Sequence, residues 1–91
     1  MKTIYIAKKA IARNAVAFLK LENGKLVVAG KFYDGPRGYP GPEVTLNNEL
    51  PTTLIDEVEL RDSWAAEMTD ELADFADKMF AEAAAQESWF E

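Results

Sequence analysis

The sequence predicts an α+β fold in which a small antiparallel sheet of three or four strands is packed by one long carboxy-terminal helix. Two observations predict this fold class. An Asn-Gly pair at positions 23 and 24 separates two runs of apolar residues, and the apolar residues of the last third recur every three or four positions. The first pattern is typical of a β-hairpin and the second of an amphipathic helix. At 91 residues, the chain has the length of a single domain.

The hairpin is predicted from its turn. Asn23 and Gly24 suit the two positive φ angles of a type I′ turn. Residues directly opposed across such a turn share a face of the sheet, so one face is almost continuously apolar and the other is mixed and half-solvated. The expected pairs are Glu22 with Lys25, Leu21 with Leu26, Leu19 with Val28, Ala17 with Gly30, and Ala15 with Phe32.

Residues 4–22 also allow a helical interpretation. Ile4, Ala7, Ile11, Ala15 and Phe18 fall at helical spacing. Gly24 would then cap the helix at its carboxyl end. The alternation through Leu19 and Leu21 favours a strand, and residues 3–7 form another expected strand. The sequence leaves the helical alternative open.

The middle of the chain contains few regular patterns. Residues 34–42 hold three glycines and three prolines, so we expect a loop at one rim of the sheet, followed by a short strand over residues 43–46. Residues 52–60 are undecided. Thr53 and Asp56 match a capping box that would start a helix, whereas Leu54, Val58 and Leu60 also suit a strand.

The helix is expected over residues 62–86, where strong helix formers predominate. Its length would be on the order of 35 Å, enough to cross a small sheet. One stripe of apolar side chains should face the core, formed by Trp64, Met68, Leu72, Phe75, Met79 and Ala83.

Charge divides the chain into two unlike halves. Residues 1–42 carry eight Lys or Arg against two acids, which gives +6, and residues 43–91 carry fourteen acids against two basic residues, which gives −12. Together they give the net charge of −6. Net charge governs association and solubility more than the path of the backbone, so this asymmetry points to binding.

Catalytic chemistry has little support in the composition. The chain has no His and no Cys, which excludes catalytic triads, thiol nucleophiles and the usual zinc sites. Asp56, Glu57 and Glu59 form the densest carboxylate group, and nothing distinguishes one of them from another. We therefore expect no enzyme, no catalytic residue, no cofactor and no metal site. The amino terminus lacks the apolar run of a signal peptide, and without cysteine a cytoplasmic location is expected.

The outer face of the predicted helix is the main candidate binding site. Five acids lie within about 120° of one another, opposite the apolar stripe. They are Glu67, Asp70, Glu71, Asp74 and Asp77. Acids one turn apart lie about 5–6 Å from each other, a spacing comparable with that of the charges on a nucleic-acid strand. A basic groove built for phosphates would accept them, so the expected partner is a nucleic-acid-binding protein or complex.

Other interpretations of these charges stay open. An amphipathic helix normally has a charged outer face, which needs no partner. Repulsion disfavours direct contact between the acids and nucleic acid, and the scattered lysines of the first half resemble solvated strand edges. We therefore expect no direct binding of nucleic acid and no binding to a membrane.

Aromatic residues supply two secondary candidates. The Pro/Gly loop is bracketed by Tyr33, Arg37 and Tyr39, and tyrosine with arginine is the composition favoured at interaction hot spots. Trp89 and Phe90 end the chain and are expected to dock on the core or on a second subunit. A structural or regulatory homodimer without a nucleic-acid-related partner is therefore the alternative function.

The compact, cysteine-free chain with its small sheet, long helix and acidic row from Glu67 to Asp77 resembles small phage-encoded inhibitors, notably anti-CRISPR and anti-restriction proteins. The resemblance implies inhibition by occupation of a basic nucleic-acid site, in the cytoplasm of the host cell. One feature departs from it. Several such inhibitors are acidic throughout, whereas residues 1–42 are basic here, which favours one acidic face over mimicry by the whole molecule.

Overall fold

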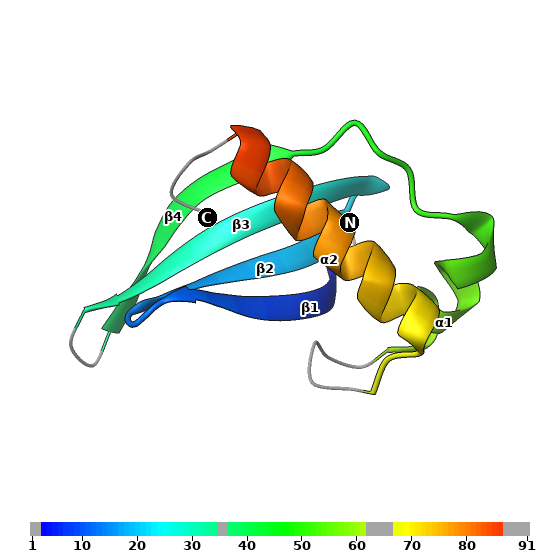
Figure 1. Ribbon diagram of the computed structural model, residues 1–91, viewed down its shortest axis with the longest axis horizontal. Helices are drawn as coiled ribbons and strands as arrows, with labels where there is room; N and C mark the ends of the chain where they lie inside the picture. The colour runs from blue at the N-terminus through cyan, green and yellow to red at the C-terminus, as the bar shows by residue number, and fades with distance from the viewer. Residues whose placement is uncertain (1–2, 35–36, 62–66, 87–91) are drawn as a thin grey trace.

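The computed structural model describes residues 3–34, 37–61 and 67–86. Four antiparallel strands form a meander in the order β1-β2-β3-β4, and the long helix α2 lies diagonally across one face of the sheet (Figure 1). This arrangement confirms the predicted α+β fold. The strands are β1 (Thr3–Ala12), β2 (Ala15–Glu22), β3 (Lys25–Asp34) and β4 (Arg37–Thr45). The helices are the 3-10 turn η1 (Thr52–Leu54), α1 (Ile55–Leu60) and α2 (Asp70–Gln86).

The hairpin between β2 and β3 has the predicted register. All five expected pairs form, from Glu22 opposite Lys25 to Ala15 opposite Phe32. The turn has φ angles of 53° at Asn23 and 80° at Gly24, the left-handed conformation that this dipeptide favours. The register is therefore set by the local chemistry of the turn.

The helical alternative for residues 4–22 is wrong. These residues form β1 and β2, joined by a second turn at Arg13 and Asn14 that the sequence analysis did not predict. β1 extends to Ala12, five residues beyond the strand expected over residues 3–7. Tertiary pairing with β2 outweighs the helix propensity of this Ala- and Lys-rich stretch.

The loop predicted for residues 34–42 is also wrong. β3 continues to Asp34, and β4 runs from Arg37 through the prolines to Thr45. β4 is an edge strand with a partner on one side only, so prolines that cannot donate a hydrogen bond are tolerated there. The pairing shifts between Ala29 and Lys31, opposite the β4 segment that holds Gly41 and Pro42.

Residues 52–60, left undecided by the sequence, are helical. The expected capping box between Thr53 and Asp56 is absent, because Leu54 is the N-cap of α1 and no side chain caps it in the part described. Thr53 instead donates a hydrogen bond of 3.1 Å from its hydroxyl to Glu71 on α2.

The long helix begins at Asp70, not at residue 62. Residues 62–66, and with them Trp64, lie outside the described residues, as do Trp89 and Phe90. Glu67 and Met68 precede the helix, and Met68 is exposed. The rest of the predicted stripe faces the sheet: Leu72, Met79 and Ala83 are buried and Phe75 is partly buried.

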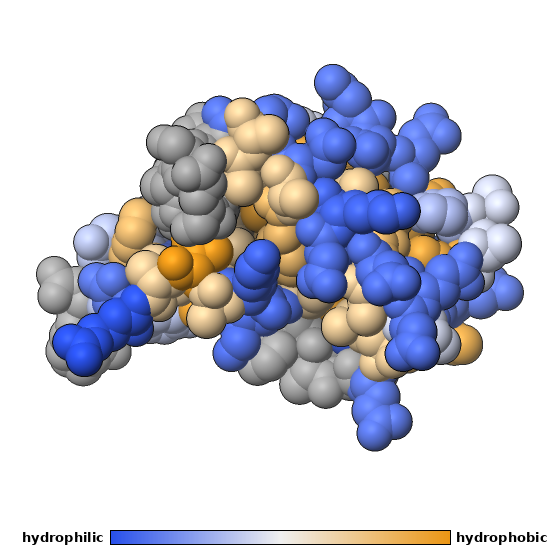
Figure 2. Space-filling view, in the orientation of Figure 1, coloured by the Kyte–Doolittle hydropathy of each residue, from blue (hydrophilic) through white to orange (hydrophobic). Residues whose placement is uncertain are grey.

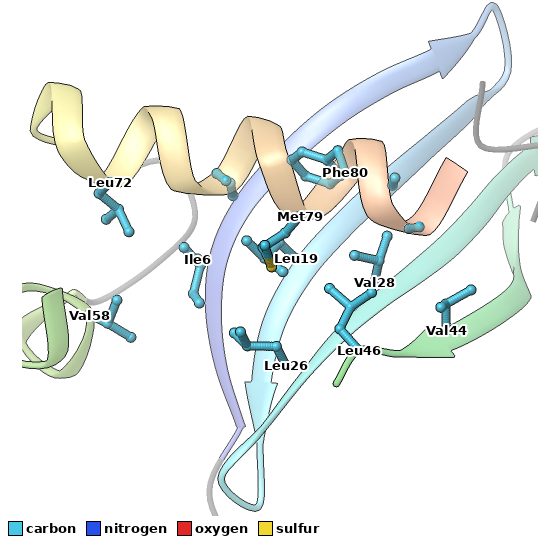
Figure 3. Close-up of a cluster of buried hydrophobic side chains, with 14 of the residues drawn as sticks. Ile6, Leu19, Leu26, Val28, Val44, Leu46, Val58, Leu72, Met79 and Phe80 are labelled. Atoms are coloured by element: carbon cyan, nitrogen blue, oxygen red, sulfur yellow. The ribbon is translucent and has the colours of Figure 1, made fainter. Parts of the chain in front are cut away.

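One hydrophobic core lies between the sheet and the helices (Figure 3). The sheet contributes the buried side chains of Ile6, Leu19, Leu26 and Val28, α1 contributes Val58, and α2 contributes Leu72, Met79 and Phe80. Within the described segments, no helix combines the length and the apolar character needed to cross a membrane.

Candidate protein-binding surface on α2

Helix α2 separates its apolar and acidic residues on opposite sides. Asp70, Glu71, Asp74 and Asp77 are all exposed, and we name these four residues the acidic face. The buried side consists of Leu72, Ala76, Met79, Phe80 and Ala83. Figure 2 shows hydrophilic side chains gathered over the amino-terminal half of α2. The acids therefore stand in solvent, as the helical periodicity predicted.

No lysine of the described residues forms an ion pair with the acidic face. Lys78 lies four residues after Asp74, at the spacing of a helical ion pair, but no ion pair joins it to Asp74 or to Glu71 within the described ranges. Both ion pairs of Lys20 lie on the sheet. Asp70 and Glu71 lie in the first turn, where negative charge suits the helix dipole, whereas Asp74 repels Asp70 one turn away by a few tenths of a kcal/mol.

Glu67 does not belong to the acidic face. It lies three residues before α2, and its backbone carbonyl accepts a hydrogen bond of 2.8 Å from Nη1 of Arg61. The second Nη of Arg61 donates to the carbonyl of Ile6 on β1 at 2.9 Å. Arg61 thereby connects the segment before α2 to the edge of the sheet.

A hydrogen-bonded cluster sets the point at which α2 begins. The hydroxyl of Thr69 accepts a bond from the backbone N–H of Leu72 at 3.2 Å, the usual contact of an N-cap residue. In a capping box, the third helical residue is Glu or Gln and reaches back to the N–H of the cap. That residue is Leu72 here, and Glu57 from α1 accepts the Thr69 N–H at 3.0 Å and the Thr69 hydroxyl at 2.6 Å instead.

This cluster makes the stability of the fold sensitive to acid. The hydrogen bonds from the Thr69 hydroxyl and backbone N–H lower the pKa of Glu57 below its ordinary value of 4.5. A folded-state pKa below the unfolded one contributes stability that is present above about pH 4.5 and lost as the pH falls through the folded pKa. We expect Glu57→Gln to be less stable than the parent near pH 7, and the difference to shrink below pH 4.5.

Chemical denaturation of both proteins from about pH 7 to about pH 3 measures this difference. Glu59→Gln is the matched control, because Glu59 is exposed on the same helix and makes no hydrogen bond with the described residues. It should follow the parent across the range. An offset between Glu57→Gln and the parent that does not change with pH would contradict the assignment.

A small hollow opens beside the acidic face where η1 approaches α2. Its volume is about 260 Å³. It is lined by Pro51, Leu54, Glu71, Asp74, Phe75 and Lys78. The lining combines apolar walls with two carboxylates and one ammonium group, that of Lys78, which leaves a net charge of −1. It therefore suits a side chain that has a hydrocarbon stem and a cationic head, as lysine and arginine have. The bond from Thr53 holds the Glu71 carboxylate on the η1 side.

Tyr39 and Arg37 are not brought together with the acidic face. Tyr39 is exposed on β4, with its ring centroid 5.4 Å from that of Phe32. Arg37 begins β4, and its side chain lies outside the described part of the structure. The beginning of β4 and the beginning of α2 lie at opposite ends of the molecule (Figure 1). The structure thus separates the two groups of predicted site residues.

The hollow could not be found from the sequence, because Leu54 and Phe75 are far apart along the chain and meet only in the folded state. The acidic face itself was visible as a helical pattern. Comparisons with family models, with curated proteins and with solved structures found no match.

Proposed function

We propose that this protein is a non-enzymatic inhibitor that binds a basic, nucleic-acid-binding protein or complex through the acidic face of α2. The observation that carries the proposal is the display of four exposed carboxylates, without ion-pair partners among the described residues, next to a hollow suited to a lysine or arginine stem. A protein that binds nucleic acid has a groove lined by Lys and Arg, and these positive charges steer an acidic surface toward the groove.

In this proposal the acids act both at long range, before the two proteins touch, and at direct contact. Their summed field accelerates encounter with a positively charged groove. At contact, Glu71 and Asp74 receive the head group of a side chain whose stem packs on Phe75 and Pro51. Occupation of the groove then excludes the phosphates of the nucleic acid. This mode of action is the one implied by the resemblance of the protein to small phage-encoded inhibitors.

Charge reversal tests the proposal. We expect Asp74→Lys with Asp77→Lys to abolish capture of the basic partner from a host-cell lysate, because the reversed face repels the groove. The matched control is Asp56→Lys with Glu59→Lys, which makes the same change of charge at exposed positions of α1. The control should capture the partner as the parent does.

The captured protein must also be held by electrostatic attraction and must bind nucleic acid through the same surface. Capture should fall between about 50 mM and about 500 mM salt, and the captured protein should lose its binding to a labelled duplex when our protein is added. Unchanged capture by the α2 variant, with circular dichroism showing an intact fold, would refute the proposal. So would a captured protein that keeps its full affinity for the duplex.

A further inference from the structure

The face of the sheet turned away from α2 carries a second, chemically different set of side chains, which we name the open face. The register places Tyr5 beside Lys20, Lys8 beside Phe18, and Ala29 between Phe18 and Glu43, all on the side opposite the core. Lys31 and Tyr33 follow Ala29 on the same side of β3. The sequence predicts a mixed and half-solvated face here.

A hollow of about 510 Å³ lies on the open face. Its size falls within the range of about 300–1,000 Å³ that is usual for ligand pockets. Side chains from all four strands line it: Tyr5, Phe18, Lys20, Ala29, Lys31, Pro40 and Glu43, with Gly30 and Gly38. The small residues of β3 leave room between the rings on one side and β4 on the other.

Two exposed aromatic rings lie on the open face, and one of them, Tyr5, lines the hollow. Tyr5 is 44% exposed and meets Phe18 edge-on, with ring centroids 6.0 Å apart. Tyr33 is 43% exposed, and Nζ of Lys31 lies 5.4 Å from the centre of its ring. Exposed rings on an open sheet offer π faces on which unpaired bases stack.

Lys20 is a charged group at the bottom of the hollow. It is only 8% exposed, and its Nζ lies 2.9 Å from Glu22 and reaches across β3 to Glu43 on β4 at 3.5 Å. Burial alone would lower the pKa of Lys20, but the hydrogen bond that Lys20 donates to Glu22 and the charges of Glu43 and Glu22 outweigh burial and raise it. Lys20 is therefore cationic at neutral pH.

The open face is positive although the protein is negative. Among its described side chains, Lys8, Lys20, Lys25 and Lys31 stand against Glu22 and Glu43, a net charge of +2 in a chain of −6. The acidic face of α2 lies on the other side of the sheet (Figure 1). The acidic face and the net positive open face thus lie on opposite sides of the sheet.

We propose that the open face binds single-stranded nucleic acid. One base stacks on Tyr5 and enters the hollow beside Phe18. A second base takes the place of Lys31 Nζ over the Tyr33 ring, and Lys31 turns to the backbone phosphate between the two bases. Aromatic platforms combined with lysines are the usual means of binding single strands without sequence preference. A duplex cannot use these platforms, because its bases are already stacked.

This inference departs from the expectation of no direct contact with nucleic acid. That expectation rested on lysines that are scattered along the chain, and strand pairing brings four of them onto one face with the rings. The inference concerns a different face from the one proposed for the protein partner, so either proposal stands if the other fails.

Fluorescence anisotropy of a labelled oligothymidylate of about fifteen nucleotides, at about 50 mM salt, tests the inference with the intact protein. We expect saturable binding to the parent protein. Tyr5→Ala and Tyr33→Ala should each weaken it by about tenfold, since one stacked base is lost in each. Lys31→Ala should weaken binding and reduce the salt dependence, as expected for one lost phosphate contact.

Tyr39→Ala is the matched control. Tyr39 is 49% exposed on the same sheet, but it packs on Phe32 on the side that carries α2. This variant should bind the oligonucleotide as the parent does, and circular dichroism should show intact folds throughout.

Four results would overturn the inference. They are no binding by the parent protein, equal losses in the Tyr39 control, and equal affinity for a duplex of the same length. The fourth is a dimeric mass in light scattering that becomes monomeric in Tyr5→Ala with Tyr33→Ala, since a second copy would then occupy the face.

Discussion

Replacing Leu72 with alanine should lower the free energy of unfolding by about 2–5 kcal/mol. The Leu72 side chain is 0% exposed and belongs to the cluster in which α2, α1 and β1 meet (Figure 3). Shortening it removes buried hydrocarbon and leaves a cavity that the backbone of two helices and a strand cannot easily fill. For a small domain with a stability of about 5–15 kcal/mol, this is a large fraction of the total.

Leu60→Ala is the control for this prediction. It makes the same chemical change at a leucine that is 81% exposed on α1, so its effect should stay within about 0.5 kcal/mol. Urea unfolding followed by circular dichroism measures both variants. Equal losses in the two would show that Leu72 is not held in the core as described. Because α2 carries the acidic face, the Leu72 variant should also lose partner binding once it is partly unfolded.

Replacing Gly24 with valine is expected to cost about 1–3 kcal/mol of stability. Gly24 has a φ of 80°, and a Cβ built on it meets nothing within 4 Å. The cost is therefore conformational and not steric crowding by neighbours, because a β-branched residue strongly resists positive φ. The hairpin register depends on this turn, so the loss should appear as a lower midpoint of thermal unfolding.

Gly24→Asn distinguishes this explanation from a general intolerance of side chains. Asparagine enters the left-handed region more readily than other residues, so this variant should retain most of the parent stability. If the asparagine variant were destabilised as much as the valine variant, the turn conformation would not be the cause.

The parts of the fold that the sequence predicted share a local origin. The register of β2 and β3 follows from two residues with positive φ, and every expected pair formed because the turn acts only on its neighbours in the chain. The buried side of α2 follows from helical periodicity, which brings residues three and four apart together. The acidic face follows from the same periodicity.

The parts that were wrong depend on contacts between distant segments. β4 passes through Pro40 and Pro42, whose local preference is for a turn, because it lies at an edge and pairs with β3. The start of α2 depends on Glu57, which lies on another helix twelve residues earlier in the chain and accepts two hydrogen bonds from the N-cap residue Thr69. A prediction from helix propensity places the start of the helix at residue 62, because propensity takes no account of the hydrogen bonds from Thr69 to Glu57.

The fold class, the register of one hairpin and the acidic side of the long helix could all be predicted from local patterns, because each depends on a turn or a period within one stretch of chain. The residue at which α2 begins, the strand at the edge of the sheet and the residues that share a surface depend on contacts between distant segments, and the folded structure was needed to find them. The hollow beside Phe75 and the cluster of Tyr5, Phe18 and Lys31 on the open face exist only where separate elements meet. No local pattern encodes such meetings, since they depend on packing and pairing across the whole chain.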